Sequence, residues 1–255
     1  MTTSTGPTTP SLSSPSPQQE DSPGREPQTV EAHFKAVYEQ FLGRTLEVDT
    51  EEQEHAIRAT AGYFLEVPEW IQQYGIDPDK GLYLVGPVGC GKSSLLKFFR
   101  KYFAAFQKYY RLQRNNSFAY TTPHWLNTCY EETGLKGLKE FTSKSYYKRG
   151  VQQVPKHYLF DEIGNEEIAR HFKNETWVMR NVIMARFDQM THSGMLTHFT
   201  TNMFPDELQA KYASSDEVSH TGELIPSRSR IESRIYRMCN VISFGDCRDF
   251  SRDKI

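Results

Sequence analysis

Eight consecutive residues of the chain have the spacing of a phosphate-binding loop, G-x-x-x-x-G-K-[ST]. They are Gly86, Pro87, Val88, Gly89, Cys90, Gly91, Lys92 and Ser93, and Ser94 follows them directly. Glycines at these positions let the backbone curl so that successive N–H groups point at phosphate oxygens from the start of a helix. In this pattern the lysine reaches the β- and γ-phosphates, and the serine hydroxyl is a ligand of Mg²⁺. The loop therefore predicts a site for a nucleoside triphosphate with its magnesium ion.

The residues on either side of the loop support this prediction. Residues 82–85 are an apolar run suited to a buried strand, and residues 94–99 begin a helical pattern. A strand that ends in the loop and a helix that starts from it are the elements needed to aim the backbone N–H groups. A glycine-rich turn that binds nothing is the alternative interpretation, and this context weighs against it.

Two adjacent carboxylates follow a second apolar run. Residues 157–160 suit a buried strand, and Asp161 and Glu162 stand at its end. Asp161 is expected to contact Mg²⁺ directly or through water, and Glu162 to act as the base that polarises the attacking water. Phosphoryl transfer depends on charge placement more than on covalent chemistry, so these groups together with a lysine suffice. A strand that ends in acidic residues is common by itself, and the phosphate loop upstream makes the assignment specific.

A polar residue ends the next predicted strand. Residues 195–200 form an apolar and β-branched run, and Thr201 and Asn202 follow it. An amide beside the acidic strand end can orient a water against the γ-phosphate, which we expect of Asn202. The same residues are equally good turn formers, so this motif is ambiguous when taken alone. His198, inside the strand, is expected to be a packed histidine and not a ligand.

The composition limits the classes of protein that the chain can represent. With 255 residues, one domain with appendages is expected, and the net charge of −2 excludes an overall field that attracts nucleic acid. The four cysteines contain no C-x-x-C pair and the eight histidines no metal-binding spacing. Mg²⁺ is therefore the only metal implied, and a reduced, cytoplasmic chain is expected. Because no apolar run approaches about 18 residues and no signal-peptide layout is present, we expect no membrane contact.

The chain divides into three segments by composition. Residues 1–30 are rich in Ser, Thr and Pro and are expected to form a disordered tail, since they offer little apolar surface to offset the entropy of ordering. Residues 31–48 should contain a short amphipathic helix and a linker. Residues 49–255 should form the nucleotide-binding domain. Its first helix is expected to begin at Thr50, with Gln53 completing a capping box.

Five strands are expected in the domain, and helical stretches separate the first four. The strand candidates are residues 82–85, 117–121, 157–160, 195–200 and 241–244. Alternation of strands and helices is typical of a mostly parallel α/β sheet. The helix after the phosphate loop should face this sheet with an apolar stripe made of Leu96, Phe99, Phe103, Phe106 and Tyr110.

A basic segment between the second and third strands could bind single-stranded DNA. Positive side chains and aromatic rings alternate there, as stacking on bases and contact with phosphates require. The candidate DNA-binding residues are Lys144, Tyr146, Tyr147, Lys148 and Arg149, with the helix face of Lys97, Lys101 and Lys108 as a further possibility. A basic loop that only covers the edge of the domain, and a solvated helix face, are the alternatives.

The order of the motifs resembles that of the DnaC/DnaI-type replicative helicase loaders, which are AAA+ ATPases. The shared blocks are Phe160-Asp161-Glu162-Ile163-Gly164, Thr197-His198-Phe199-Thr200-Thr201-Asn202, Pro205-Asp206-Glu207-Leu208, Ser229-Arg230-Ile231-Glu232-Ser233-Arg234-Ile235 and Val241-Ile242-Ser243-Phe244-Gly245-Asp246-Cys247-Arg248. The resemblance covers roughly residues 50 to 250. IstB-type transposition helper ATPases share the layout and are the close alternative. The chain departs from the group in a longer connection between Tyr212 and Ser229.

The resemblance implies a fold, a reaction and further site residues. The fold is a P-loop NTPase of AAA+ type, a parallel five-stranded sheet of order 5-1-4-3-2 flanked by helices, without a C-terminal helical lid. The reaction is Mg²⁺-dependent hydrolysis of ATP to ADP and phosphate. Arg234 matches the arginine finger that acts on the γ-phosphate of a neighbouring subunit, and Arg230 is the alternate finger. Self-association is therefore implied, and the role of Arg248 stays open.

The implied partners are a replicative DNA helicase or a transposase, with single-stranded DNA. A different class, a small-molecule P-loop kinase, leaves the motifs around Asn202, Arg230 and Arg234 unexplained. A nucleotide-dependent switch or scaffold is the third class, and it would bind ATP without stimulation by DNA. The products separate these classes, because a kinase transfers the phosphoryl group to a metabolite and an ATPase releases it.

Overall fold

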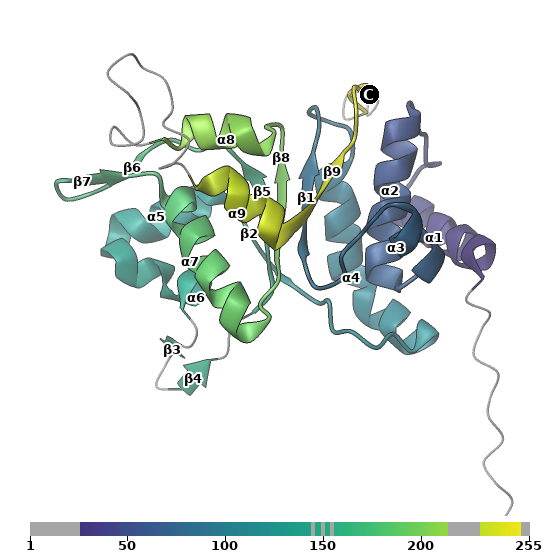
Figure 1. The fold of residues 1–255 in the computed structure, drawn as a ribbon, viewed down its shortest axis with the longest axis horizontal. Helices are drawn as coiled ribbons and strands as arrows, with labels where there is room; N and C mark the ends of the chain where they lie inside the picture. The colour runs from purple at the N-terminus through teal and green to yellow at the C-terminus, as the bar shows by residue number, and fades with distance from the viewer. Residues whose placement is uncertain (1–25, 144–145, 149–150, 154–155, 214–229, 251–255) are drawn as a thin grey trace, which may run out of the picture.

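A five-stranded parallel sheet forms the centre of the molecule, and helices cover both of its faces (Figure 1). The computed structural model describes residues 26–143, 146–148, 151–153, 156–213 and 230–250. The strands are β1 (Gly81–Val85), β2 (Ala119–Thr121), β5 (Tyr158–Ile163), β8 (Thr197–Thr201) and β9 (Cys239–Ser243). Their order across the sheet is β2-β5-β8-β1-β9, and every neighbouring pair is parallel. In chain order this is 5-1-4-3-2, so the predicted parallel five-stranded α/β sheet and its strand order are confirmed.

The central strand shows why both faces need helices. All five residues of β1 are buried. The side chains of the four residues after Gly81 alternate between two separate apolar clusters. Leu82 and Leu84 belong to one cluster, whereas Tyr83 and Val85 belong to the other. Successive side chains of a strand point to opposite faces, so an uninterrupted apolar strand is stable only when both faces are covered.

The helices are distributed over the two faces in the order of the chain. One face carries α1 (Pro27–Leu42), α2 (Glu51–Leu65), α3 (Pro68–Gln73) and α4 (Lys92–Tyr110). The other carries α5 (Pro123–Thr133), η1 (Gly134–Leu138), α6 (Lys139–Thr142), α7 (Val178–Ser193), α8 (Pro205–Lys211) and α9 (Ile231–Met238). Two antiparallel hairpins complete the described elements, β3 (Tyr146–Lys148) with β4 (Val151–Gln153), and β6 (Ala169–His171) with β7 (Asn174–Thr176).

Helix α4 packs through the stripe that its sequence predicts. The side chains of Leu96, Phe99, Phe103, Phe106 and Tyr110 are all buried. Burial of each leucine or phenylalanine side chain contributes roughly 1.5–3 kcal/mol. Phe99 stacks on Phe64 of α2 and on Phe34 of α1, with ring centroids 4.5 and 5.7 Å apart. Three helices therefore share one aromatic core.

Helix α1 is longer and better anchored than the composition indicates. It begins at Pro27 and so includes the last residues of the segment expected to be a tail. Val30, Phe34 and Tyr38 are buried in the same core as α2 and α4. The predicted helix therefore packs against α2 and α4, and a non-helical segment connects it to α2, while residues 1–25 lie outside the described residues.

The predicted start of α2 is confirmed. The Thr50 hydroxyl accepts a hydrogen bond from the backbone N–H of Gln53, at 3.1 Å. The Gln53 side chain returns to the N–H of Asp49, at 2.7 Å, one residue before the cap position that a standard capping box uses. The side-chain nitrogen of Gln53, Nε2, is therefore available to donate a hydrogen bond to another part of the molecule.

His198 is a packed residue of β8, as expected. Its ring is fully buried among Tyr63, Phe64 and Phe118. The Nδ1 atom accepts a hydrogen bond from the backbone N–H of Leu82, at 3.2 Å. Burial, reinforced by the charge of nearby cationic groups, lowers the pKa of His198 to about 3.

The free energy of unfolding should therefore fall in acid. The unfolded chain binds a proton at His198 below about pH 6.5, whereas the folded chain does so only near its lowered pKa. Each pH unit between these values removes about 1.4 kcal/mol of stability. Urea denaturation at pH values from 7.5 to about 4.5 should give a flatter dependence for His198→Asn, which keeps an acceptor for Leu82. The exposed His124, changed to Asn, is the control and should keep the wild-type slope. Equal slopes for all three proteins would contradict this account.

Candidate functional site

The predicted phosphate loop joins β1 to α4. Val85 ends the strand, and Lys92 is the first residue of the helix. Gly89 and Gly91 have φ values of 81° and 99°, which residues with a side chain rarely adopt. A Cβ atom at Gly89 would also lie 2.9 Å from the Cα of Asp249. The first backbone N–H groups of a helix have no acceptor within the helix, and no side chain caps those of α4. They are therefore available to an anion bound at the loop.

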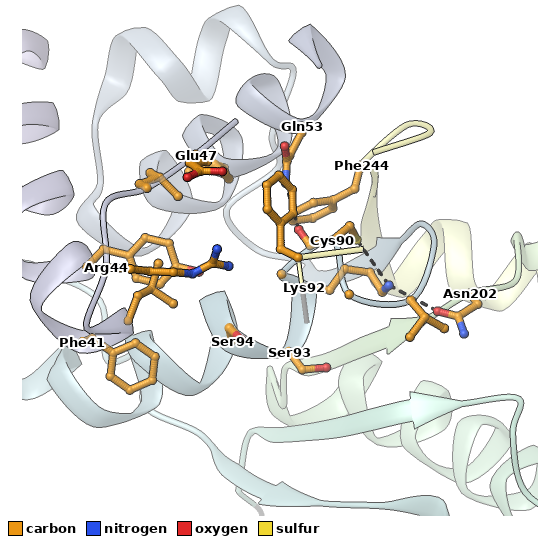
Figure 2. A pocket seen from close by; sticks show the side chains of 18 of the residues that line it. Phe41, Arg44, Glu47, Gln53, Cys90, Lys92, Ser93, Ser94, Asn202 and Phe244 are labelled. Carbon is orange, nitrogen blue, oxygen red and sulfur yellow. Dashed lines mark hydrogen bonds between the residues drawn. The ribbon is translucent and has the colours of Figure 1, made fainter. Parts of the chain in front are cut away.

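Lys92 lies over the loop and meets Asn202 from a neighbouring strand end (Figure 2). Its Nζ atom donates to the carbonyl oxygens of Gly86 and Pro87, both at 2.7 Å, and to Oδ1 of Asn202, at 3.2 Å. Cys90 Sγ is 3.4 Å from the same nitrogen. The structure thus brings together the lysine and the amide that were predicted from separate motifs.

Ser93 and Asp161 also meet. The Ser93 hydroxyl donates to Oδ1 of Asp161, at 2.6 Å. Three more donors surround this buried carboxylate: Thr200 Oγ1 at 2.6 Å, Lys97 Nζ at 2.9 Å and Tyr120 OH at 3.0 Å. Burial opposes ionisation, but the hydrogen bonds from the donors outweigh it, so the pKa of Asp161 lies below its usual value. Hard oxygen donors of this kind fit Mg²⁺, and Ser93 and Asp161 would hold it.

Glu162 is exposed although its neighbour Asp161 is buried, and the strand is irregular at this residue. The register between β5 and β8 shifts between Phe160 and Ile163, and Glu162 has a φ of 64°. Its backbone N–H donates to Oγ1 of Thr200, at 2.8 Å, while its side chain is exposed. A positive φ on a non-glycine residue costs energy and needs support from its surroundings, which Thr200 provides here.

A cavity of about 670 Å³ joins these groups to an apolar wall. Its polar end consists of the loop from Val88 to Ser94 with Glu162 and Asn202. The rest of the lining consists mainly of apolar side chains, which are Tyr38, Phe41, Leu42, Leu46, Ile57, Phe244 and Phe250. Of these, Phe244 lies beside Cys90 at the loop itself (Figure 2). Arg44 and Glu47 also line the cavity, and Figure 2 shows them on the side remote from Asn202. Cavities of this size and mixed lining are typical of sites for small organic ligands.

The predicted finger arginines do not line this cavity. Arg230 precedes α9 and Arg234 lies one turn later in it. The Arg234 guanidinium lies over the ring of Phe187, 5.0 Å from its centroid, and Nη1 donates to the carbonyl oxygen of Arg230 at 3.3 Å. Within one chain, the structure does not bring either arginine to Lys92.

Arg248, in contrast, contacts two residues that line the cavity, Glu47 and Phe250. Its guanidinium pairs with Glu47, and its backbone N–H donates to Asp49 Oδ2 at 3.0 Å. It also lies 4.6 Å from the ring centroid of Phe250, which lines the cavity. This arginine therefore ties the segment after β9 to the loop between α1 and α2.

The candidate DNA-binding residues are only partly within the described structure. Lys144 and Arg149 lie outside it, while Tyr146, Tyr147 and Lys148 form β3, which pairs with β4. In the further basic face, Lys97 is bonded to Asp161, and Lys101 lies over the rings of Phe41 and Tyr102. Lys97 is thus paired with a buried carboxylate and is not simply a solvated cation.

Sequence reasoning missed four residues of the site: Thr200, Tyr120, Lys97 and Gln53. The carboxyl ends of parallel strands lie at one edge of a sheet, and this rule could have found Thr200 and Tyr120 in β8 and β2. Gln53 donates through Nε2 to the carbonyl oxygen of Cys90, at 3.1 Å, and so supports the phosphate loop from α2. No local pattern indicates that contact.

Comparison with known proteins finds similarity at the level of solved structures only. No family model and no curated protein matches the chain. A candidate primosome component from Streptococcus pyogenes serotype M3 is similar at 17% identity and a TM-score of 0.45, over 78% of this chain and 82% of that one. DnaI is similar at 22% identity and a TM-score of 0.47, over 80% and 87%. In the described residues, no helix is both long and apolar enough to span a bilayer.

The Thr200 hydroxyl should stabilise the site measurably. Thr200→Val removes a donor to Asp161 and the acceptor for the Glu162 N–H, leaving buried polar groups unsatisfied. We expect the free energy of unfolding, measured with urea, to fall by about 2–4 kcal/mol, because about 1–3 kcal/mol is lost for each such group. Thr200→Ser should restore most of the loss. Thr128→Val, where the hydroxyl contacts only the carbonyl of His124 one turn earlier, is the control. Equal losses at Thr128 and Thr200 would argue against a specific role.

Proposed function

We propose that the chain binds and hydrolyses ATP with Mg²⁺ and acts as a helicase loader of the DnaC/DnaI type. The observation that carries the enzymatic part is that Lys92, Ser93, Glu162 and Asn202, which come from three different strands or the loops after them, line one cavity, while Ser93 is hydrogen-bonded to the buried Asp161. A phosphate loop alone is compatible with several classes of protein. A lysine, a serine–aspartate pair, an exposed carboxylate and an amide at one edge of the sheet are the groups that NTP hydrolysis needs.

The two ends of the cavity suit the two ends of a nucleotide. Backbone N–H groups at the start of α4 and the Lys92 ammonium favour phosphate oxygens. The wall that contains Phe41, Leu42 and Phe250 offers apolar surface for a planar base. Bound Mg²⁺, held by Ser93 and Asp161, would supply positive charge to the phosphate oxygens.

The residues of the chain can take distinct roles in hydrolysis. Lys92 stabilises the charge that develops on the transferring phosphoryl group. Glu162, which lies at the irregular part of β5 and lines the cavity, acts as the base for the attacking water. Asn202 orients that water, and its contact with Lys92 keeps both groups at the phosphate end of the cavity.

Partners of this chain follow from the motif order and the position of the arginines. We infer that a replicative helicase with single-stranded DNA is the target, with DNA contacts around β3 and β4. Arg230 and Arg234 do not line the cavity of their own chain, so they are available to complete the site of a second copy. A transposase is the alternative partner, and capture of one in place of a helicase would favour the IstB-type role.

Glu162→Gln should separate binding from hydrolysis. The amide cannot act as a base, so the turnover number should fall by about 100-fold or more while a fluorescent ADP analogue binds with wild-type affinity. Lys92→Ala should abolish that binding. The nearby exposed Glu167, changed to Gln, is the control and should hydrolyse at the wild-type rate. Product analysis should find ADP and free phosphate. Wild-type turnover by Glu162→Gln would refute the assigned base.

Mixing two inactive variants should restore activity if the site is completed by a second copy. Arg234→Ala lacks the finger and Lys92→Ala lacks the phosphate lysine, so a mixed interface contains one intact site. We expect a 1:1 mixture to exceed the summed rates of the separate variants, and wild-type specific activity to rise with protein concentration. The exposed Tyr236 on α9, changed to Ala, provides a control for damage to that helix. Concentration-independent turnover by a monomer would exclude this arrangement.

A further inference from the structure

Lys97 contacts the proposed metal-binding carboxylate from the same helix that carries the phosphate loop serine. Its Nζ atom lies 2.9 Å from Oδ2 of Asp161. Ser93 and Lys97 are four residues apart in α4, so one helical turn places both on the face toward β5. Helix α4 therefore supplies both a hydroxyl and a full positive charge to one carboxylate.

The hydrogen-bonding capacity of this carboxylate is fully used. Oδ1 accepts from Ser93 and Thr200, and Oδ2 accepts from Lys97 and Tyr120. Two carboxylate oxygens offer about four lone-pair sites, so each site already has a donor. A metal ion, or a water bound to one, can contact Asp161 only if a donor moves away.

Of the four donors, Lys97 can move away from Asp161 most easily, because its side chain is open to solvent. The Thr200 side chain is fully buried, whereas the Lys97 side chain is 44% exposed. Its ammonium also lies 5.2 Å from the ring centroid of Tyr120, and the Arg100 guanidinium lies 5.4 Å from the same centroid. The like charge of Arg100 and access to solvent both favour release of Lys97.

We propose that Lys97 is an internal counter-ion that competes with Mg²⁺ for Asp161. Lys97 holds the carboxylate in place before the metal binds, and it moves toward solvent when Mg²⁺ enters with the nucleotide. The competition makes nucleotide binding require more Mg²⁺ than the phosphate loop alone would need. This inference rests on the nucleotide site proposed above and concerns its regulation by magnesium.

The physical basis of the competition is the sign and distance of the charges. The Lys97 ammonium and Mg²⁺ are both cations, and both require the same buried oxygen atoms. Removal of one positive charge a few ångströms from a metal site favours metal binding by a Coulomb energy that is only partly screened in a half-buried site. A tenfold change in affinity corresponds to about 1.4 kcal/mol, well within that energy.

Lys97→Gln tests the competition directly. We would titrate MgCl₂ into protein with a fixed concentration of N-methylanthraniloyl-ADP and follow the fluorescence of the bound nucleotide. The half-saturating Mg²⁺ concentration should be about tenfold lower than in the wild type, because the neutral amide does not oppose the metal. Lys97→Met should behave in the same way, and Lys97→Arg should stay near the wild type.

The control is Lys108→Gln, which removes an exposed cation three turns further along α4 and should leave the Mg²⁺ dependence unchanged. If nucleotide binds but Lys97→Gln and Lys97→Met need as much Mg²⁺ as the wild type, or more, the competition is refuted and the nucleotide site stands. If the wild type binds no nucleotide at any Mg²⁺ concentration, both the site and the competition are refuted.

Discussion

The rest of the site depends on one buried carboxylate, that of Asp161. Its four donors belong to α4, β2 and β8, and the aspartate itself to β5. A buried charge without hydrogen bonds is costly, so each of these elements must keep its position relative to the others. The phosphate loop is thereby tied to the acidic strand through side chains, in addition to the main-chain pairing of the sheet.

The irregular backbone at Glu162 allows one of two adjacent carboxylates to be buried and the other to be exposed. In a regular strand, successive side chains point to opposite faces, and one of the two would enter a face covered by helices. The shifted register and the positive φ of Glu162 let the strand bury Asp161 and expose its neighbour to the cavity. Two carboxyl groups thus acquire different environments: that of Asp161 is buried and hydrogen-bonded, and that of Glu162 is exposed to the cavity.

The wall opposite the phosphate loop is built by segments from both ends of the domain. Tyr38 and Phe41 come from α1, and Phe250 follows β9. Arg248 pairs with Glu47 and lies against Phe250, so this contact links the two segments. Helix α1 also shares its aromatic core with α4, the helix that begins at Lys92. The helix that composition alone would set apart from the domain therefore lines its main cavity.

The sequence by itself predicted the phosphate loop between a strand and a helix, the five strands and the apolar stripe of α4, and it indicated Asp161, Glu162 and Asn202 as candidate site residues; Asp161 and Glu162 lie inside β5 and not after its end. These features depend on glycine spacing and on local hydrophobic periodicity, and resemblance to a known group of ATPases supplied the strand order. Only the tertiary structure decided that Lys97, Tyr120 and Thr200 surround Asp161 and that Gln53 supports Cys90. Each of these contacts joins residues that are far apart in the chain, and Lys97 lies on a helix face that periodicity assigns to solvent. A local sequence pattern does not specify which distant donor forms a hydrogen bond with a buried charged group, because the packing of helices and strands determines which side chains meet.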